Sequence, residues 1–173
     1  GDNSKNRARG GVAAHVYETA GSYTVKCTPI TVSSSGTLSV GATSSTTITV
    51  AAADTTYSGT NTICIANGTL PVAGVGGVPA GATCYNETTW SGVASRFGAN
   101  KRILLKRGDT WSINTYATVN VSGIQIGAYG TGSKPKLSWT ANEYAFYVSG
   151  SPDGVTIMDF ECDGVSSAAS KYI

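Results

Sequence analysis

Charged residues are scarce in this chain. They make up 13% of its 173 residues, and the net charge is +2, whereas an average soluble domain is about 25% charged. This shortage argues against helical bundles and coiled coils, whose helices are rich in charge and poor in glycine. The small net charge gives no reason to expect a nucleic-acid partner. No apolar run reaches the length of about 18 residues that a membrane helix needs, so no membrane span is expected.

Histidine is nearly absent, since His15 is the only one. A metal site or catalytic triad built on histidine is therefore not expected. Glycine is abundant instead, with 22 residues, nearly twice the average share of about 7%. Hydrophobic residues make up 40% of the chain, which argues against disorder. Together with the many serines, threonines and valines, this composition is typical of short strands and many turns, and it predicts an all-β protein.

The pattern along the chain predicts three parts. Residues 1–52 contain strictly alternating strands, with Tyr23, Val25 and Cys27 on one face, and predict an antiparallel β-sandwich. Residues 53–87 have few alternating positions and are expected to be a linker or loop. Residues 88–173 show a third pattern of very short apolar runs between turns.

The third part opens with the only helical signal in the sequence. Trp90, Val93, Ala94 and Phe97 follow the spacing of one helix face. The apolar runs after this helix are only two to four residues long, which is short for sandwich hairpins. Such strands are typical of a β-solenoid, where each one pairs with its equivalent in the next coil. In this arrangement Asn120 points outward.

Two segments resemble known families. The first comprises Gly1-Asp2, His15-Val16-Tyr17 and Gly21-Ser22-Tyr23-Thr24-Val25, and it closes on Thr47-Ile48-Thr49-Val50. This segment resembles the second half of a PKD-type β-sandwich. The resemblance implies an incomplete sandwich in which His15 packs beside Tyr17.

The second segment runs from Lys101 to Trp111 and continues in the string Gly127-Ala128-Tyr129-Gly130-Thr131-Gly132-Ser133-Lys134-Pro135. It is similar to the first coils of right-handed parallel β-helix proteins of the pectate-lyase-like superfamily. The resemblance implies that 88–173 is the N-terminal part of such a β-helix. The helix near Trp90 would then be the cap that protects the open end of the first coil.

Three glycosylation sequons, together with the low content of lysine and glutamate, favour an extracellular or cell-surface protein, and the chain also has four cysteines. A disulfide between Cys64 and Cys84 would close a loop of about 20 residues and stabilise the fold by roughly 3 kcal/mol. The alternative is a pair of thiols. The sequons place candidate glycans on Asn67, Asn86 and Asn120.

A basic cluster is the candidate surface for an acidic polysaccharide, through charge-assisted hydrogen bonds. An ordinary solvated face is the alternative interpretation. The cluster consists of Lys101, Arg102, Lys106 and Arg107. Arg107-Gly108-Asp109 also spells the integrin-binding tripeptide, but a strand-ending turn explains it more simply.

Three carboxylates, Asp159, Glu161 and Asp163, alternate on one predicted strand and would share its outward face. Their oxygens suit Ca²⁺ or acid–base chemistry on a sugar. The same alternation is also what any outward strand face looks like.

Aromatic residues form a further candidate, because their rings could stack on sugars, although core or cap packing is the alternative for Trp90 and Trp111. They are Trp90, Trp111, Trp139, Tyr129 and Tyr147.

The expected function is that of a piece of a secreted, modular, carbohydrate-active protein that binds an acidic polysaccharide. In a lyase, a carboxylate or bound Ca²⁺ would acidify the C5 proton of the sugar and Lys or Arg would remove it. Such residues are expected beyond Ile173, so no catalytic residue is assigned and this piece is expected to be non-catalytic. One alternative is a structural or adhesive surface protein, such as a filament subunit or tailspike-like module, that self-associates through unpaired β edges. Another is a pure carbohydrate-binding module.

Overall fold

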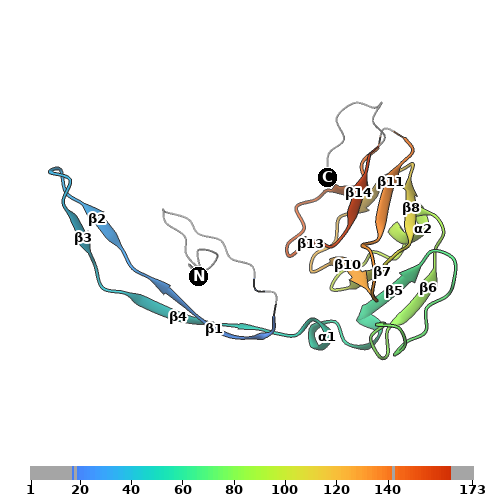
Figure 1. Ribbon diagram of the computed structural model, residues 1–173, viewed down its shortest axis with the longest axis horizontal. Coiled ribbons are helices and arrows are strands. Elements are labelled where there is room, and N and C mark those ends of the chain that lie inside the picture. Colours follow the sequence, from blue (N-terminus) through green and yellow to red (C-terminus); the bar gives the residue numbers. More distant parts are fainter. Residues whose placement is uncertain (1–16, 18, 142, 165–173) are drawn as a thin grey trace. The chain divides into compact units, whose positions relative to one another are not determined.

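The computed structural model describes Tyr17, residues 19–141 and residues 143–164. Gly1-Asp2 and His15, on which part of the sandwich resemblance rests, lie outside the described residues. The chain forms two compact units, Gly1–Thr56 and Tyr57–Ile173. Strands dominate both units and the helices are short, which confirms the all-β class (Figure 1). None of the described helices has the length and apolar composition needed to cross a membrane.

The first unit contains an extended β-hairpin. Its elements are β1 (Gly21–Cys27), β2 (Ile30–Val32), β3 (Leu38–Val40), β4 (Ser44–Val50) and the short helix α1 (Ala53–Thr56). β1 pairs with β4 and β2 pairs with β3, both antiparallel, so the second ladder lies nearer the hairpin tip (Figure 1). Both ladders belong to this one hairpin. Among the described residues of this unit there is no further sheet to pack against it, as a sandwich requires. The sandwich therefore stays a prediction.

The second unit is built from ten short strands and two helices among its described residues. They are η2 (Gly59–Asn61), β5 (Thr62–Ala66), β6 (Thr83–Asn86), α2 (Trp90–Ala94), β7 (Arg102–Lys106), β8 (Thr110–Ile113), β9 (Ala117–Val119), β10 (Gln125–Tyr129), β11 (Lys136–Trp139), β12 (Phe146–Val148), β13 (Thr156–Ile157) and β14 (Glu161–Asp163). They form three sheets, and every pairing within them is parallel.

The chain visits the three sheets in a fixed order. The first sheet has the strand order β13-β10-β7-β5-β6, the second β14-β11-β8 and the third β12-β9. From β7 the chain passes through β8 and β9 and returns to pair β10 with β7. It then passes through β11 and β12 and returns to β13. Each such passage is called a circuit here. Successive circuits therefore stack strand on strand.

Inward side chains of successive circuits stack on one another inside the three sheets. The register places Ile63 opposite Ile103, Ile103 opposite Ile126, and Ile126 opposite Ile157. The first three are at most 8% exposed, and Ile157 packs against the same core. Burying one such side chain stabilises the fold by about 1.5–3 kcal/mol. This isoleucine ladder holds four strands of the first sheet in register.

Helix α2 agrees with the sequence prediction, although it is shorter than the predicted helical pattern. Its N-cap is Thr89, whose side chain accepts a hydrogen bond of 3.1 Å from the Gly92 N–H. Trp90 and Val93 are fully buried, and α2 packs against β8 and β9. The indole N–H of Trp90 donates to the Ala145 carbonyl at 2.9 Å, which ties the helix to the chain segment before β12.

The segment 53–87 is more than the linker that the sequence predicted, because it supplies β5 and β6 to the first sheet. Every residue of β5 is buried. This sheet is covered on both faces, so its strands do not alternate between polar and apolar residues, and the alternation that reveals a strand is missing. On the outer face Cys64, Leu104 and Tyr129 pack under Val78 and Ala82, which belong to the segment 67–82. We call this segment the glycine loop.

The glycine loop depends on a close backbone approach at Gly77. A Cβ at this position would lie 2.9 Å from the Gly130 Cα and backbone nitrogen, and the φ angle of Gly77 is +84°. Gly74, in the same loop, has a φ of +80° with nothing within 4 Å of its Cβ position. The two glycines thus share a left-handed backbone, but only Gly77 is also sterically confined.

We expect Gly77→Ala to lower the free energy of unfolding by about 2–4 kcal/mol, because it adds a backbone clash to an unfavourable φ. Gly74→Ala is the matched control and should cost only about 1 kcal/mol. The measurement is urea denaturation followed by tryptophan fluorescence, since all three tryptophans lie in the second unit. Equal losses for the two variants would contradict the close approach.

Candidate functional site

Two tyrosines lie against each other on the outer face of the third sheet. Tyr147 belongs to β12 and is paired with Thr118 of β9, and Tyr116 directly precedes β9. Their ring centroids are 5.6 Å apart and the ring planes meet at 64°, an edge-to-face arrangement. Tyr116 is 49% exposed and Tyr147 is 51% exposed. We call these two residues the tyrosine pair.

Strand alternation explains why the tyrosine pair faces outward. Ala117, Val119 and Phe146 are buried in the core. Their neighbours along the strands must therefore point the other way. Because β9 and β12 are stacked in parallel register, the outward positions of two successive circuits meet. The pair is thus a fixed feature of the sheet surface.

Of the five aromatic residues that the sequence singled out, only Tyr147 is exposed. The tryptophans are at most 5% exposed and Tyr129 is 6% exposed. The indole N–H groups of Trp111 and Trp139 donate to backbone carbonyls at 2.8 Å each, as expected for structural residues. Sequence reasoning missed Tyr116. Its signal was available, because Tyr116 shares the outward alternation of Thr118 and Asn120.

The structure does not bring the four basic residues together. The Nζ of Lys101 donates at 3.0 Å to the Thr60 carbonyl and at 3.0 Å to the Asn61 side-chain oxygen. Arg102 is 6% exposed, and its Nε donates to the Thr62 hydroxyl at 3.1 Å. Both residues lie at the first end of β7, where they support the junction with β5.

Lys106 and Arg107 lie at the other end of β7. Because each residue of a strand adds roughly 3.3 Å, the length of the strand separates them from Lys101 and Arg102. The Lys106 Nζ is 3.7 Å from a carboxylate oxygen of Asp109, and Arg107 forms an ion pair with Asp159. The Arg107-Gly108-Asp109 tripeptide forms the turn between β7 and β8, with a Gly108 φ of +84°, which confirms the simpler interpretation. The Asp109 carboxylate also accepts the Asn67 backbone N–H at 2.8 Å.

The three carboxylates do not share one strand face, which corrects the sequence prediction. β14 begins at Glu161, and Asp159 precedes it with a φ of +70°, so the alternation is broken there. Asp159 pairs with Arg107 and lies 3.6 Å from the Lys134 Nζ. No group of three possible metal-ligating histidine, cysteine or acidic side chains occurs among the described residues. The carboxylates that were predicted to hold Ca²⁺ face cations instead.

Lys136 joins the remaining two carboxylates. Its Nζ is 3.1 Å from Glu161 and 3.6 Å from Asp163, across the parallel pairing of β11 with β14. The hydrogen bond to Glu161 raises the pKa of Lys136, and the negative charges of Glu161 and Asp163 raise it further. The lysine therefore stays charged and is not suited to act as a general base near neutral pH.

The predicted disulfide between Cys64 and Cys84 is not formed, and none of the four cysteines, all of which are described, is in a disulfide. The register pairs Cys64 directly with Cys84 on neighbouring strands. The two side chains are therefore neighbours across the sheet, and no disulfide joins them.

Tyr129 lies on the same outer face as these cysteines. Its hydroxyl is buried and finds no hydrogen-bond partner among the described residues. Burial raises the pKa of Tyr129, and the neighbouring Cys64, Asp109 and Cys84 raise it further. The side chain therefore remains a neutral phenol. It fills space beneath the glycine loop and is not available for stacking on a sugar.

Two of the three sequon asparagines have structural roles. The Asn67 side-chain amide donates to the Thr110 carbonyl at 2.7 Å. The Asn86 side chain both accepts from the Gly68 N–H at 2.8 Å and donates to the Gly68 carbonyl at 3.1 Å. These contacts hold the start of the glycine loop. Asn120 is exposed, as predicted for an outward position, and it lies on the same sheet face as the tyrosine pair.

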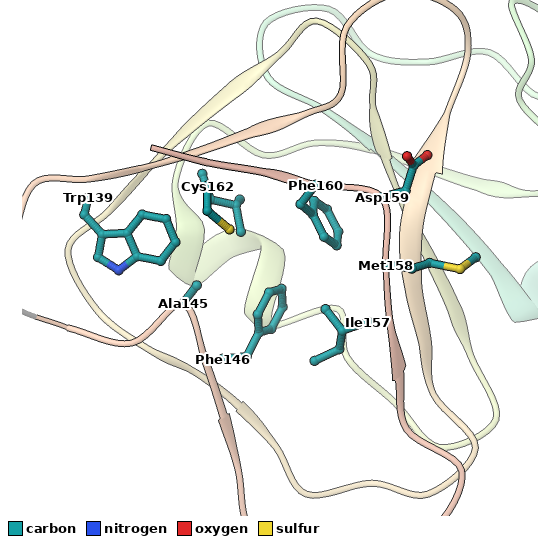
Figure 2. Close-up of a pocket in the computed structure, with 9 residues that line it drawn as sticks. Trp139, Ala145, Phe146, Ile157, Met158, Asp159, Phe160 and Cys162 are labelled. Carbon is teal, nitrogen blue, oxygen red and sulfur yellow. The ribbon is translucent and has the colours of Figure 1, made fainter. Parts of the chain in front are cut away.

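An apolar pocket of about 170 Å³ lies where the last described circuit ends (Figure 2). Phe146, Ile157 and Phe160 point toward one another in it, with the two phenyl centroids 6.0 Å apart. Asp159 is the only charged residue in its lining. The remaining lining residues are Leu137, Trp139, Ala145, Met158 and Cys162. This composition is that of a packing layer and offers few polar groups to a soluble ligand.

Comparisons of the chain with models of known families, with curated proteins and with solved structures give no match. The function is therefore inferred from the geometry of the described residues. In that geometry the tyrosine pair stands out, because it exposes large aromatic surface on a rigid sheet face.

We expect the four cysteines to react as thiols with very different rates. A maleimide should label Cys27 first, since it is exposed, and Cys64 last, since it has no exposed surface. Burial raises the pKa of Cys84, so its labelling rate should still increase with pH above 8.5 or so. Peptide mass spectrometry after timed labelling measures these rates, and labelling in denaturant is the control. A Cys64–Cys84 peptide two mass units lighter than the dithiol would contradict this assignment.

Proposed function

We propose that this protein binds an extracellular polysaccharide through the tyrosine pair. The exposure of both rings supports the proposal most directly, because large aromatic side chains usually bury their apolar surface. The C–H face of a pyranose ring is apolar, and its edge carries hydroxyl groups. A ring pair with apolar faces and phenolic hydroxyls offers matching surfaces for both.

The arrangement of the strands supports a parallel β-helix as the scaffold of this site. All strand pairings of the second unit are parallel, and the chain returns to the same sheets in the same order. Helix α2, with its buried Trp90 and Val93, supports the proposed role as a cap. A right-handed β-helix of the pectate-lyase-like kind remains the fold that we propose, with a PKD-like sandwich in the first unit.

Each circuit of such a scaffold adds one strand, with its outward side chains, to every sheet. A polymer with a regular repeat can run across these faces and contact equivalent positions of successive circuits. Tyr116 and Tyr147 belong to successive circuits and are diagonal neighbours, since Tyr147 is paired with Thr118, so a ligand that contacts both rings extends over two circuits. We assign no catalytic residue, because the acidic side chains best placed for one, Asp159, Glu161 and Asp163, are already paired with cations.

An extracellular location is part of the proposal. The low share of charged residues and the three sequons support it. Asn67 and Asn86 support the glycine loop through their amides, whereas Asn120 is exposed.

We expect Tyr147→Ala to weaken polysaccharide binding about tenfold, which is the size of effect of removing an aromatic hot-spot residue. Tyr147→Phe should retain most of the affinity, because it keeps the ring. Affinity electrophoresis against a panel of soluble neutral and acidic polysaccharides, followed by calorimetry on the best ligand, measures the change. The matched control is Tyr23→Ala, which removes one ring of the Tyr17–Tyr23 pair in the first unit. Unchanged binding in Tyr147→Ala would contradict the proposed site.

A second candidate function is self-association, as in a structural surface protein, and the hairpin of the first unit favours it. The register places Ile30, Val32, Leu38 and Val40 on one face of the β2–β3 ladder. These side chains are 56–68% exposed. We call them the hairpin face. Residues 27–53 contain no charged side chain, so two copies of this face can approach without like-charge repulsion.

We expect the protein to form concentration-dependent oligomers, and the double variant Val32→Lys/Leu38→Lys to abolish them by placing like charges on the hairpin face. The control is Thr31→Lys/Ser39→Lys, which adds the same charges to the opposite face of the same ladder. Sedimentation velocity over a hundredfold range of concentration measures the association. A monomer throughout, or equal effects of the two double variants, would rule out the hairpin face as the contact.

A further inference from the structure

We infer that the tyrosine pair takes an uncharged polysaccharide, built from neutral pyranose units, and not the acidic polymer that the basic residues first suggested. This inference rests on the proposed function and names the ligand class of the same site. It follows from where charged residues lie relative to the third sheet.

The surroundings of the tyrosine pair in the chain are free of charge. Residues 110–133, which include Tyr116 and all of β9, contain no charged side chain. Residues 144–152, which include Tyr147 and all of β12, contain none either. The charged residues that flank this second segment are Glu143 and Asp153, both acidic. A uronate polymer lying on the pair would therefore find no cation from these strands and two carboxylates at their borders.

The cations that lie in the second sheet and in the turns leading into it are already paired with carboxylates of the last circuit. Lys136 contacts Glu161 and Asp163, and Arg107 and Lys134 contact Asp159. An acidic ligand would have to replace these contacts. The side chains of Glu161 and Asp163 are also half-exposed, at 50% and 55%, and would repel a polyanion that approached along this side.

Neutral hydrogen-bonding groups surround the pair instead. Thr118 is directly paired with Tyr147, and the exposed Asn120 follows on the same strand face. Hydroxyl and amide groups both donate and accept, which matches sugar hydroxyls and gives no advantage to a carboxylate. Binding by aromatic stacking and neutral hydrogen bonds should be nearly independent of salt, because screening acts only on charged groups.

The test uses the full chain produced in a bacterial cytoplasm, so that Asn120 carries no glycan. Binding is measured to two neutral probes, hydroxyethyl cellulose and galactomannan, and to two acidic probes, polygalacturonate and alginate, at low and high salt. We expect at least one neutral probe to bind at least tenfold more tightly than either acidic probe, with less than a twofold change between the two salt concentrations. Tyr116→Ala and Tyr147→Ala should each reduce this binding about tenfold, whereas Tyr23→Ala should not.

The outcomes separate the ligand class from the site. If an acidic probe binds as tightly as the neutral ones, or more tightly, and its binding still depends on Tyr147, the neutral class is overturned while the proposed site stands. If no probe binds, or if binding does not change in either tyrosine variant, the proposed function itself fails and the inference fails with it. A circular dichroism spectrum of each variant identifies any loss of binding that comes from misfolding.

Discussion

The stacking of isoleucines across four strands is the interaction on which the second unit depends. Ile63, Ile103, Ile126 and Ile157 occupy equivalent positions of neighbouring parallel strands. A shift of one residue in any strand would move its isoleucine from the core to the other face of the sheet. The ladder therefore fixes the register of each circuit against the previous one, and every outward position is fixed as a consequence.

This register decides which surface residues meet. Tyr116 and Tyr147 are distant in the chain, but the register that pairs Tyr147 with Thr118 makes them diagonal neighbours, with ring centroids 5.6 Å apart. The same rule produces the row of ion pairs between β11 and β14, where Lys136 meets the carboxylates of the following circuit. Parallel stacking therefore produces two different surfaces. The third sheet has an uncharged face with two exposed tyrosines, and the second sheet has a face of paired charges. The uncharged face is suited to binding, because its surface is exposed, while the charges of the other face largely satisfy one another.

Much of the local structure could be predicted from the sequence. The helical spacing of Trp90, Val93 and Phe97 indicated the helix that became α2, and the alternation around Asn120 gave its outward direction. The Arg107-Gly108-Asp109 turn followed from the conformational freedom of glycine. Strand β5 was missed because all of its residues are buried, which removes the alternating pattern, and β6 was missed because it has only four residues, none of them fully buried. The grouping of Asp159 with Glu161 on one strand face was wrong because Asp159 itself has a left-handed backbone, with a φ of +70°, and lies before the start of β14.

The sequence by itself determined the all-β class and the turn at Arg107-Gly108-Asp109, since these follow from composition and from glycine placement within short windows. Only the tertiary structure decided which residues of different circuits become neighbours. It placed Cys64 opposite Cys84 on neighbouring strands, gave the four basic residues separate structural partners and joined two tyrosines into one exposed pair. The physical reason is that parallel stacking brings together residues that are far apart in the chain, and no local pattern encodes the register of that stacking.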